Sequence, residues 1–369
     1  MLRSLLIAAT LVALLSPSTG WADAAHRMGP LPARTRNPLY LLHLQPGPRR
    51  AQVLAPAVVS LDAQVDWANI FDVWGRTVSE GRQLSDLDME IVRTGLSLRI
   101  GVLPRFEVGI EVPTLTLGPG VTDGFIEAWH AAIKADNGGR EEVRSSTFGY
   151  RVQIPDVIRY SPEPVTLGLG DIVLDATAQL LRADKLIPDL AASLYFKLPT
   201  GSYERGTGSG VPDVSFVVYV EHGVRALTGY AHAGVIILGR DGDLANLLRP
   251  ASFTFGMGFE LALSHGLSFV AQLQGSSSFN HGFVHKYSSL SPMGLTLGGR
   301  FRVGEMVFGL GMEQDVLNGD PSADLTIVFD ARFTIGGERQ GSGVGRAGRW
   351  GPRSGAAPST AATDLNRRP

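Results

Sequence analysis

The chain has 369 residues, of which 44% are hydrophobic and 18% charged, and its formal net charge is -2. This composition is typical of a folded protein, and a near-neutral charge without a basic stripe argues against nucleic acid as a partner. Cysteine is absent, which excludes disulfides, thiolate metal sites and thiol catalysis. The 45 glycines are unusually many and follow no collagen period, so they indicate turns and closely approaching strands.

The N-terminal segment predicts a secretory signal peptide over residues 1–24. Arg3 precedes an apolar run from Leu5 to Leu15, and the small-residue pattern Ala22-Asp23-Ala24 marks the expected cleavage site. A retained helical anchor is the alternative, but the run is shorter than the roughly 20 residues that a spanning helix needs. We therefore expect an exported protein.

Residues 25–56 form the next segment, with several prolines and arginines around an apolar island from Leu39 to Leu44. This composition predicts an irregular N-terminal arm. The sequence leaves open whether the arm lies in the periplasm or folds into a lumen.

From Val59 onward apolar and polar side chains alternate with a period of two, which is typical of β-strands. The clearest example is a hairpin on either side of Ser264-His265-Gly266. Within the second strand a change of phase near Gly95 predicts a bulge and places Asp88 and Glu90 on the interior face. Twelve strands are expected, at Val59–Trp67, Leu87–Ile100, Arg105–Val112, Ile172–Leu180, Leu190–Leu198, Val214–Val220, Leu227–Ile237, Phe253–Leu263, Leu267–Leu273, Leu295–Val303, Met306–Met312 and Leu325–Ile335.

The connections between these strands are sorted by length. Those after even-numbered strands are short, such as Gly101–Pro104, whereas those after odd-numbered strands are mostly long, the longest being Pro113–Asp171. Short turns at one end and long loops at the other are typical of an outer-membrane barrel with both termini in the periplasm. The sequence therefore predicts an all-β fold, a transmembrane antiparallel up-and-down β-barrel of about twelve strands over residues 57–336. Its expected partners are outer-membrane lipid and the barrel-assembly machinery.

The longest loop contains the one convincing helix, expected from Asp123 to Ala135. Phe125 and Trp129 belong to an apolar stripe at helical spacing, and Asn137-Gly138-Gly139 ends the pattern. In a barrel a long loop can fold inward, so Phe125, Trp129 and His130 are candidates for a constriction of the pore. A helix that covers the mouth for stability alone is an equal alternative.

Charged residues on the expected interior face are the candidates for a solute path. Acids outnumber bases there, and an acid-rich lumen would favour cations or polar solutes. A structural ion-pair network that fills a narrow barrel is the alternative. The candidates are Asp62, Asp66, Glu107, Glu111, Asp171, Asp175, Arg300 and Arg302.

No catalytic pattern is recognisable. None of the histidines lies in a hydrolase motif, and His281 and His285 are four residues apart in a segment whose glycine and serines argue against a helix. We therefore expect no enzyme activity, no metal site and no cofactor. Residues 337–369 lack periodicity and are rich in Gly, Ala, Ser, Pro and Arg, which predicts a disordered tail.

Three blocks of the sequence resemble an uncharacterised family of proteobacterial outer-membrane barrel proteins of unknown function. They are Asn37-Pro38-Leu39, then Phe125-Ile126-Glu127-Ala128-Trp129-His130 with Asn137-Gly138-Gly139-Arg140, and Lys197-Leu198-Pro199-Thr200-Gly201 with Gly206-Thr207-Gly208-Ser209-Gly210 and Pro212-Asp213. The third block is also similar to putative outer-membrane transporters associated with aromatic-compound degradation. The resemblance covers roughly residues 37–335 and implies a location and a fold without an activity.

These observations predict a channel or facilitated-diffusion protein for a small solute. The alternative is a closed barrel with a structural or surface-binding role.

Overall fold

The computed structural model describes residues 27–74, 84–133, 145–154, 158–184, 186–241, 243–280, 291–315 and 325–336. The expected signal peptide, the expected tail and the histidine pair at 281 and 285 lie outside these ranges. Within them, no helix is long and apolar enough to cross a bilayer. The same ranges contain no group of three or more His, Asp or Glu side chains that could hold a metal ion.

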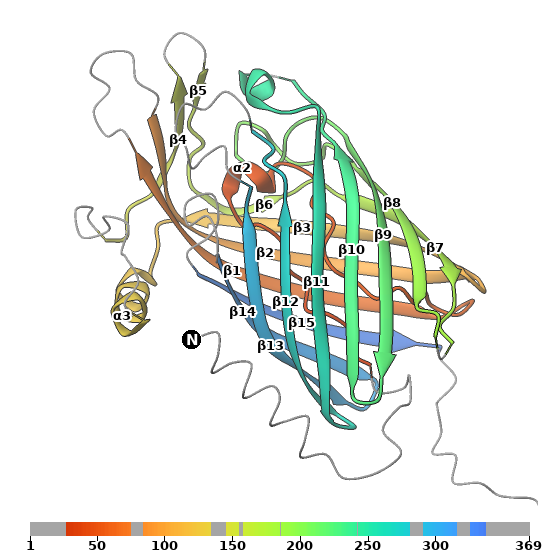
Figure 1. Cartoon of the computed structure of the whole chain (residues 1–369). Coiled ribbons are helices and arrows are strands. Elements are labelled where there is room, and N and C mark those ends of the chain that lie inside the picture. The colour runs from red at the N-terminus through yellow and green to blue at the C-terminus, as the bar shows by residue number, and fades with distance from the viewer. Residues whose placement is uncertain are drawn as a thin grey trace, which may run out of the picture. The chain divides into compact units, whose positions relative to one another are not determined.

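Twelve antiparallel strands close into one barrel (Figure 1). Each strand pairs with the next around the wall, and the last pairs with the first. The strands are β1 (Val59–Trp74), β2 (Leu84–Leu103), β3 (Phe106–Gly118), β7 (Val173–Leu181), β8 (Asp189–Lys197), β9 (Asp213–Val224), β10 (Leu227–Ile237), β11 (Ala251–Ser264), β12 (Leu267–Ser276), β13 (Met293–Val303), β14 (Met306–Asp315) and β15 (Leu325–Ile335). The twelve strands expected from the alternation are confirmed in number and order.

The barrel has a short-turn end and a long-loop end. At the short-turn end only two residues separate β9 from β10, β11 from β12 and β13 from β14. At the long-loop end the connection from β3 to β7 carries three further strands that the sequence analysis missed. They are β4 (Gly149–Ile154) and β6 (Val165–Leu169), which extend the sheet beside β2 and β3, and β5 (Ile158–Tyr160), which pairs with β4.

The two faces of the wall differ in chemistry as expected. On β11, Phe253 and Met257 are exposed on the outer surface, whereas Thr254 and Glu260 are buried toward the interior. An apolar outer face suits hydrocarbon, while closure of the sheet satisfies every backbone group of the wall.

The predicted bulge near Gly95 is wrong, because β2 pairs with both neighbours in one continuous register through that position. Arg93 therefore shares the inward face with Met89, and Asp88 and Glu90 face outward. The apparent change of phase has a chemical cause. Near the long-loop end the inward side chains are apolar because they pack against the N-terminal arm.

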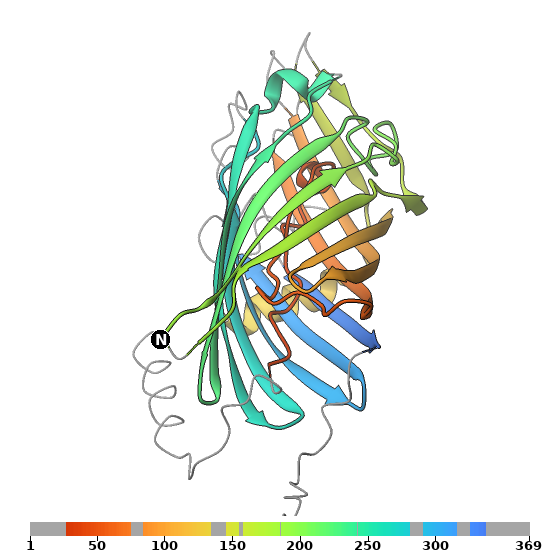
Figure 2. The ribbon, with the colours of Figure 1, turned by 90° about the vertical axis from the view of Figure 1, so that its right-hand side faces the viewer.

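The arm, residues 27–56, runs inside the barrel (Figure 2). It is irregular except for one turn of helix, α2 (Pro38–Leu41), which lies near the long-loop end. Asn37 caps this helix by accepting a hydrogen bond from the Leu39 N–H at 2.9 Å, and Pro38 occupies the first helical position, where its missing N–H costs nothing.

Candidate functional site: the arm and the lumen

The arm enters at the short-turn end, reaches α2 and returns to the start of β1, so two limbs of chain lie in the lumen. On the first limb, Glu260 accepts hydrogen bonds from the N–H groups of Met28 and Gly29, each at 3.0 Å. The side chain of Gln272 accepts from the Leu31 N–H at 3.0 Å and donates to the Leu31 carbonyl at 2.9 Å. Side chains of β11 and β12 thus satisfy backbone groups that would otherwise be buried without partners.

Leu31 is fully buried in a notch formed by Gly298, Gly309 and Gly311 on the inward faces of β13 and β14. A Cβ atom at any of these three positions would lie 2.7 Å from a methyl carbon of Leu31. Real Cβ contacts are almost never that close. The absence of side chains at this part of the wall is therefore what makes room for the arm.

Arg300 holds the same limb of the arm. Its Nε donates to the Gly29 carbonyl at 3.0 Å, another of its nitrogens donates to the Pro30 carbonyl, and Nη1 pairs with Asp330 at 2.6 Å. The side chain is fully buried. Arg300, one of the predicted solute-path residues, is thus in contact with the arm.

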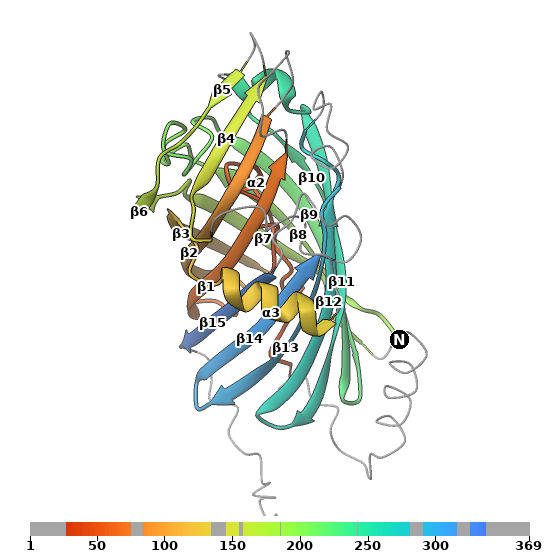
Figure 3. The same ribbon diagram turned by 90° about the vertical axis from the view of Figure 1, so that its left-hand side faces the viewer.

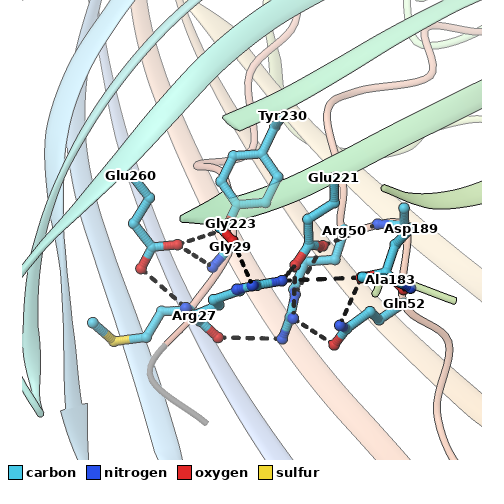
Figure 4. Close-up of polar contacts among 12 residues, drawn as sticks. Arg27, Gly29, Arg50, Gln52, Ala183, Asp189, Glu221, Gly223, Tyr230 and Glu260 are labelled. Atoms are coloured by element: carbon cyan, nitrogen blue, oxygen red, sulfur yellow. Dashed lines mark hydrogen bonds and ion pairs between the residues drawn. The ribbon is translucent and has the colours of Figure 1, made fainter. Parts of the chain in front are cut away.

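Both limbs meet at one pair of acids near the short-turn end (Figure 4). Glu221 accepts from Arg50 at 2.9 and 3.2 Å and from Arg27 at 3.4 Å. Asp189 accepts from Gln52 at 2.9 Å and lies 3.9 Å from Arg27. The two acids are directly opposite each other on β8 and β9, and both side chains are fully buried. Cationic partners are needed here because like charges directly opposite across strands are destabilising.

Arg49, which precedes Arg50 on the second limb, also binds the wall. It pairs with Glu107 and, at 2.9 Å, with Asp175, and its guanidinium lies 5.8 Å from the ring centre of Tyr219. The carboxylates of Glu107 and Asp175 stabilise this guanidinium, which keeps its proton at neutral pH. The arm therefore remains cationic inside the lumen.

Lys197 anchors the arm at the long-loop end. Its ammonium donates to the Leu42 carbonyl at 2.8 Å, to Asp171 at 2.7 Å and to the Ser209 hydroxyl at 2.5 Å, and it lies 3.1 Å from Asp213. The side chain is only 2% exposed. One buried ammonium thus joins the arm to the ends of β8 and β9 and to the loop between them.

The glycine-rich block singled out in the sequence folds around the carboxylate of Asp171. The N–H groups of Gly201 and Ser209 donate to this carboxylate at 2.8 and 3.2 Å. A Cβ atom at Gly208 would collide with the same carboxylate. The block therefore shapes the Lys197 site.

Apolar packing around α2 completes the closure at the long-loop end. Tyr40 stacks on Phe279 with ring centres 4.5 Å apart. One cluster contains Leu39, Leu42, Ala68, Ile70, Leu87, Met89, Ile91, Leu115, Leu117, Tyr150, Val152, Tyr160, Val165 and Leu247. The other contains Tyr40, Leu44, Ala51, Ala191, Tyr195, Val217, Tyr219, Ile236, Leu238, Leu248 and Phe279.

The arm leaves a cavity of about 370 Å³ between itself and the wall. Arg34 and Arg49 line it from the arm, and Gln64, Ser97 and Arg99 line it from β1 and β2. The space is polar and lies inside the barrel, so it is the remnant of a lumen.

The predicted solute-path residues face this interior, but they have partners. Asp62 pairs with Arg332 at 2.7 Å, Asp66 with Arg36 at 2.9 Å, and Glu111 with Arg34 at 3.4 Å. The other five candidates also lie at the cavity or in contact with the arm: Glu107, Asp171, Asp175, Arg300 and Arg302.

The helix of the longest loop, α3 (Asp123–Ile133), does not occupy the lumen. Figures 1 and 3 place it on the outer side of the wall. Its first residue accepts a hydrogen bond from the outward-facing Asn69, and Glu90 accepts from the Thr122 N–H at 2.5 Å. Phe125 is 56% exposed. The structure therefore places Phe125 outside the lumen, and the side chains of Trp129 and His130 lie outside the described part of the chain.

The arm residues that fill the lumen were not identified from the sequence, although two signals were available. Residues 27–56 contain five arginines and no aspartate or glutamate, opposite a wall rich in acids. The glycines at 298, 309 and 311 also lie on the same face of two neighbouring strands, which indicates a place where another backbone or side chain approaches.

Comparison with solved structures confirms the fold. The fold is similar to the COG4313 outer membrane channel from Pseudomonas putida F1, at 11% identity and a TM-score of 0.51 over 79% of this chain and 100% of that chain. A weaker likeness is to the NanC porin, at 8% identity and a TM-score of 0.42 over 74% of this chain and 98% of that chain. Another is to the Ralstonia pickettii toluene transporter TbuX, at 10% identity and a TM-score of 0.35 over 76% of this chain and 90% of that chain. The fold is that of a transmembrane barrel of the outer-membrane channel type.

The chain itself belongs to the family described as protein of unknown function, DUF3187, whose model matches residues 4–335. This agrees with the resemblance noted in the sequence. No curated protein matches the chain.

Proposed function

We propose that this protein is an outer-membrane channel for a small polar solute, held closed by its own N-terminal arm. The observation that carries the proposal is that the arm fills a polar lumen as a separate segment, continuous with the barrel only through the start of β1. The fold supports the same proposal, because the barrel resembles an outer membrane channel along the whole length of that protein. The long loops would then lie outside the cell and the short turns in the periplasm.

The test is to compare the full-length barrel with a variant that lacks residues 27–54. That deletion removes both limbs but keeps Ala57, whose N–H donates to the Gly101 carbonyl beside β1. In planar bilayers the full-length protein should be silent or rarely open, and the deletion variant should conduct steadily. Heat-dependent gel mobility shows whether each variant has a folded barrel.

A closed barrel with a structural or surface-binding role is the second candidate. The apolar clusters around α2 favour it, because they are packed like a protein core. A folded deletion variant that carries no current would support this second candidate and overturn the channel.

A further inference from the structure

The arm and the wall that surrounds it carry opposite charges. Residues 27–56 contain Arg27, Arg34, Arg36, Arg49 and Arg50 and no acidic residue. Each of these arginines pairs with an inward-facing carboxylate of the wall. The partners are Glu221, Glu111, Asp66, Glu107, Asp175 and Asp189.

The basic side chains of the wall make a different set of contacts. Arg300, Arg332 and Lys197 donate to backbone carbonyl oxygens of the arm and pair with acids of the wall. They therefore have acidic partners whether or not the arm is present. The arm supplies the ion-pair partners of Asp189 and Glu221. Glu107 and Asp175 pair with Arg49 of the arm and also interact with Arg99 of β2.

Four of the acids that pair with the arm lie on consecutive strands. Glu107, Asp175, Asp189 and Glu221 belong to β3, β7, β8 and β9, which are neighbours in the wall. Their side chains are at most 9% exposed while the arm is in place. We call these four residues the acidic arc. Without the arm, four carboxylates would face one water-filled passage with Arg99 as the wall cation beside two of them, so the arc would carry a net negative charge.

We propose that the arm is a cationic plug, and that the lumen it leaves conducts cations in preference to anions because of the acidic arc. This inference rests on the proposed channel function and adds the class of solute. A narrow passage lined with one sign of charge concentrates the opposite ion, and rings of Asp and Glu select cations in channels.

The first experiment measures the reversal potential of the 27–54 deletion variant under a KCl gradient. We expect K⁺ to permeate several-fold better than Cl⁻. Adding Glu107→Gln, Asp175→Asn, Asp189→Asn and Glu221→Gln to the deletion should remove most of this preference. Glu305→Gln, at the exposed turn between β13 and β14, is the matched control and should leave it unchanged.

The second experiment restores the arm as a free peptide of residues 27–54. This peptide should block the current of the deletion variant, and the block should weaken as salt rises because ion pairs in a wet lumen are screened. A peptide with all five arginines replaced by glutamine should block weakly. Equal block by both peptides would overturn the electrostatic plug.

The outcomes separate the two proposals. A conducting variant without cation preference overturns the acidic arc and leaves the channel intact. A folded variant that carries no current overturns the channel itself. If the deletion prevents folding, the reversal potential is measured on open events of the full-length chain carrying Arg27→Gln, Arg49→Gln and Arg50→Gln. Open events without cation preference overturn the acidic arc, and a variant as silent as the parent overturns the electrostatic plug.

Discussion

The smallest feature on which the closed lumen depends is the glycine notch at residues 298, 309 and 311. It accommodates one side chain, Leu31, and it has no room for a methyl group. At Gly311 the atom nearest to an added Cβ belongs to Leu31, so glycine is required there because the arm is present. At Gly298 and Gly309 an added Cβ would also collide with the wall, at the Leu310 carbonyl and the Asp330 carboxylate.

Gly311→Ala should therefore expel the arm without breaking the barrel. Overpacking of this kind costs about 1–3 kcal/mol, and we expect open-channel events to become more frequent in bilayer recordings. Adding Leu31→Ala should restore the closed state, because the shorter side chain removes the clash. Gly118→Ala, where nothing lies within 4 Å of the added atom, should behave like the parent. Failure of the second change to rescue the first would contradict the notch.

Glu221 is the residue that joins both limbs of the arm. Glu221→Gln should loosen them together, because it weakens the pairing of Arg27 and Arg50 with one carboxylate. The chain has no cysteine, so Leu31→Cys supplies a single reporter thiol. We expect this thiol to react with a soluble maleimide at least several-fold faster in the Glu221→Gln background than in a Glu305→Gln background. Equal rates would show that the pairing of Glu221 with Arg27 and Arg50 does not hold the arm.

At the scale of elements, the sequence predicted the wall better than its contents. Each strand carries its own alternation, so Leu227–Ile237 and Leu325–Ile335 have the bounds that the pattern predicts. The arm has no such period. Its position is decided by partners that are distant in the sequence, such as Glu260 for Met28 and Gly311 for Leu31.

The error at β2 has the same origin. Leu87, Met89 and Ile91 are apolar because they pack against the arm on the inward face. An interpretation of the alternation that expects polar side chains toward a wet lumen therefore assigns these residues to the wrong face. The outward Glu90 accepts hydrogen bonds from the loop that covers it and from the Trp67 indole. Side-chain chemistry reports the immediate surroundings, and those surroundings include the arm.

The loop between β8 and β9 also belongs to this scale, because Lys197 connects it to the arm. Lys197→Met would leave Asp171 and Asp213 buried without their shared cation, and losing one partner of a buried pair costs about 3–5 kcal/mol. We expect a lower unfolding midpoint in detergent and faster labelling of a thiol at Leu42→Cys. The control is Arg205→Met, which changes an exposed arginine of the same loop. Similar midpoints and rates in the two variants would argue against an anchor at Lys197.

The helix α3 is expected to be neutral for conduction, since its contacts lie on the outer side of the wall. Phe125→Ala in the 27–54 deletion variant should change single-channel conductance less than about twofold, because this side chain is already largely in solvent. A large rise in conductance would instead return α3 to the role of a constriction.

For the whole molecule, the decisive relation is between two parts of one chain: a closed twelve-stranded wall and the segment that precedes it. The wall supplies acids, glycines and amide side chains on its inner face, and the arm supplies arginines, one leucine and backbone groups that fit them. Closure therefore reflects matched chemistry along the whole length of the arm, and it can be tested at a single contact.

The most direct measurement is a cross-link between Leu31→Cys and Gly311→Cys in the otherwise cysteine-free chain. A Cβ at residue 311 would lie 2.7 Å from Leu31 Cδ1, which brings two cysteines within reach of disulfide geometry. An arm seated in the lumen predicts that mild oxidation of folded protein in membranes forms the intramolecular disulfide, whereas a Leu31→Cys and Gly118→Cys pair does not react. Free thiols at both positions after oxidation, each open to alkylation, would contradict an arm that fills the barrel.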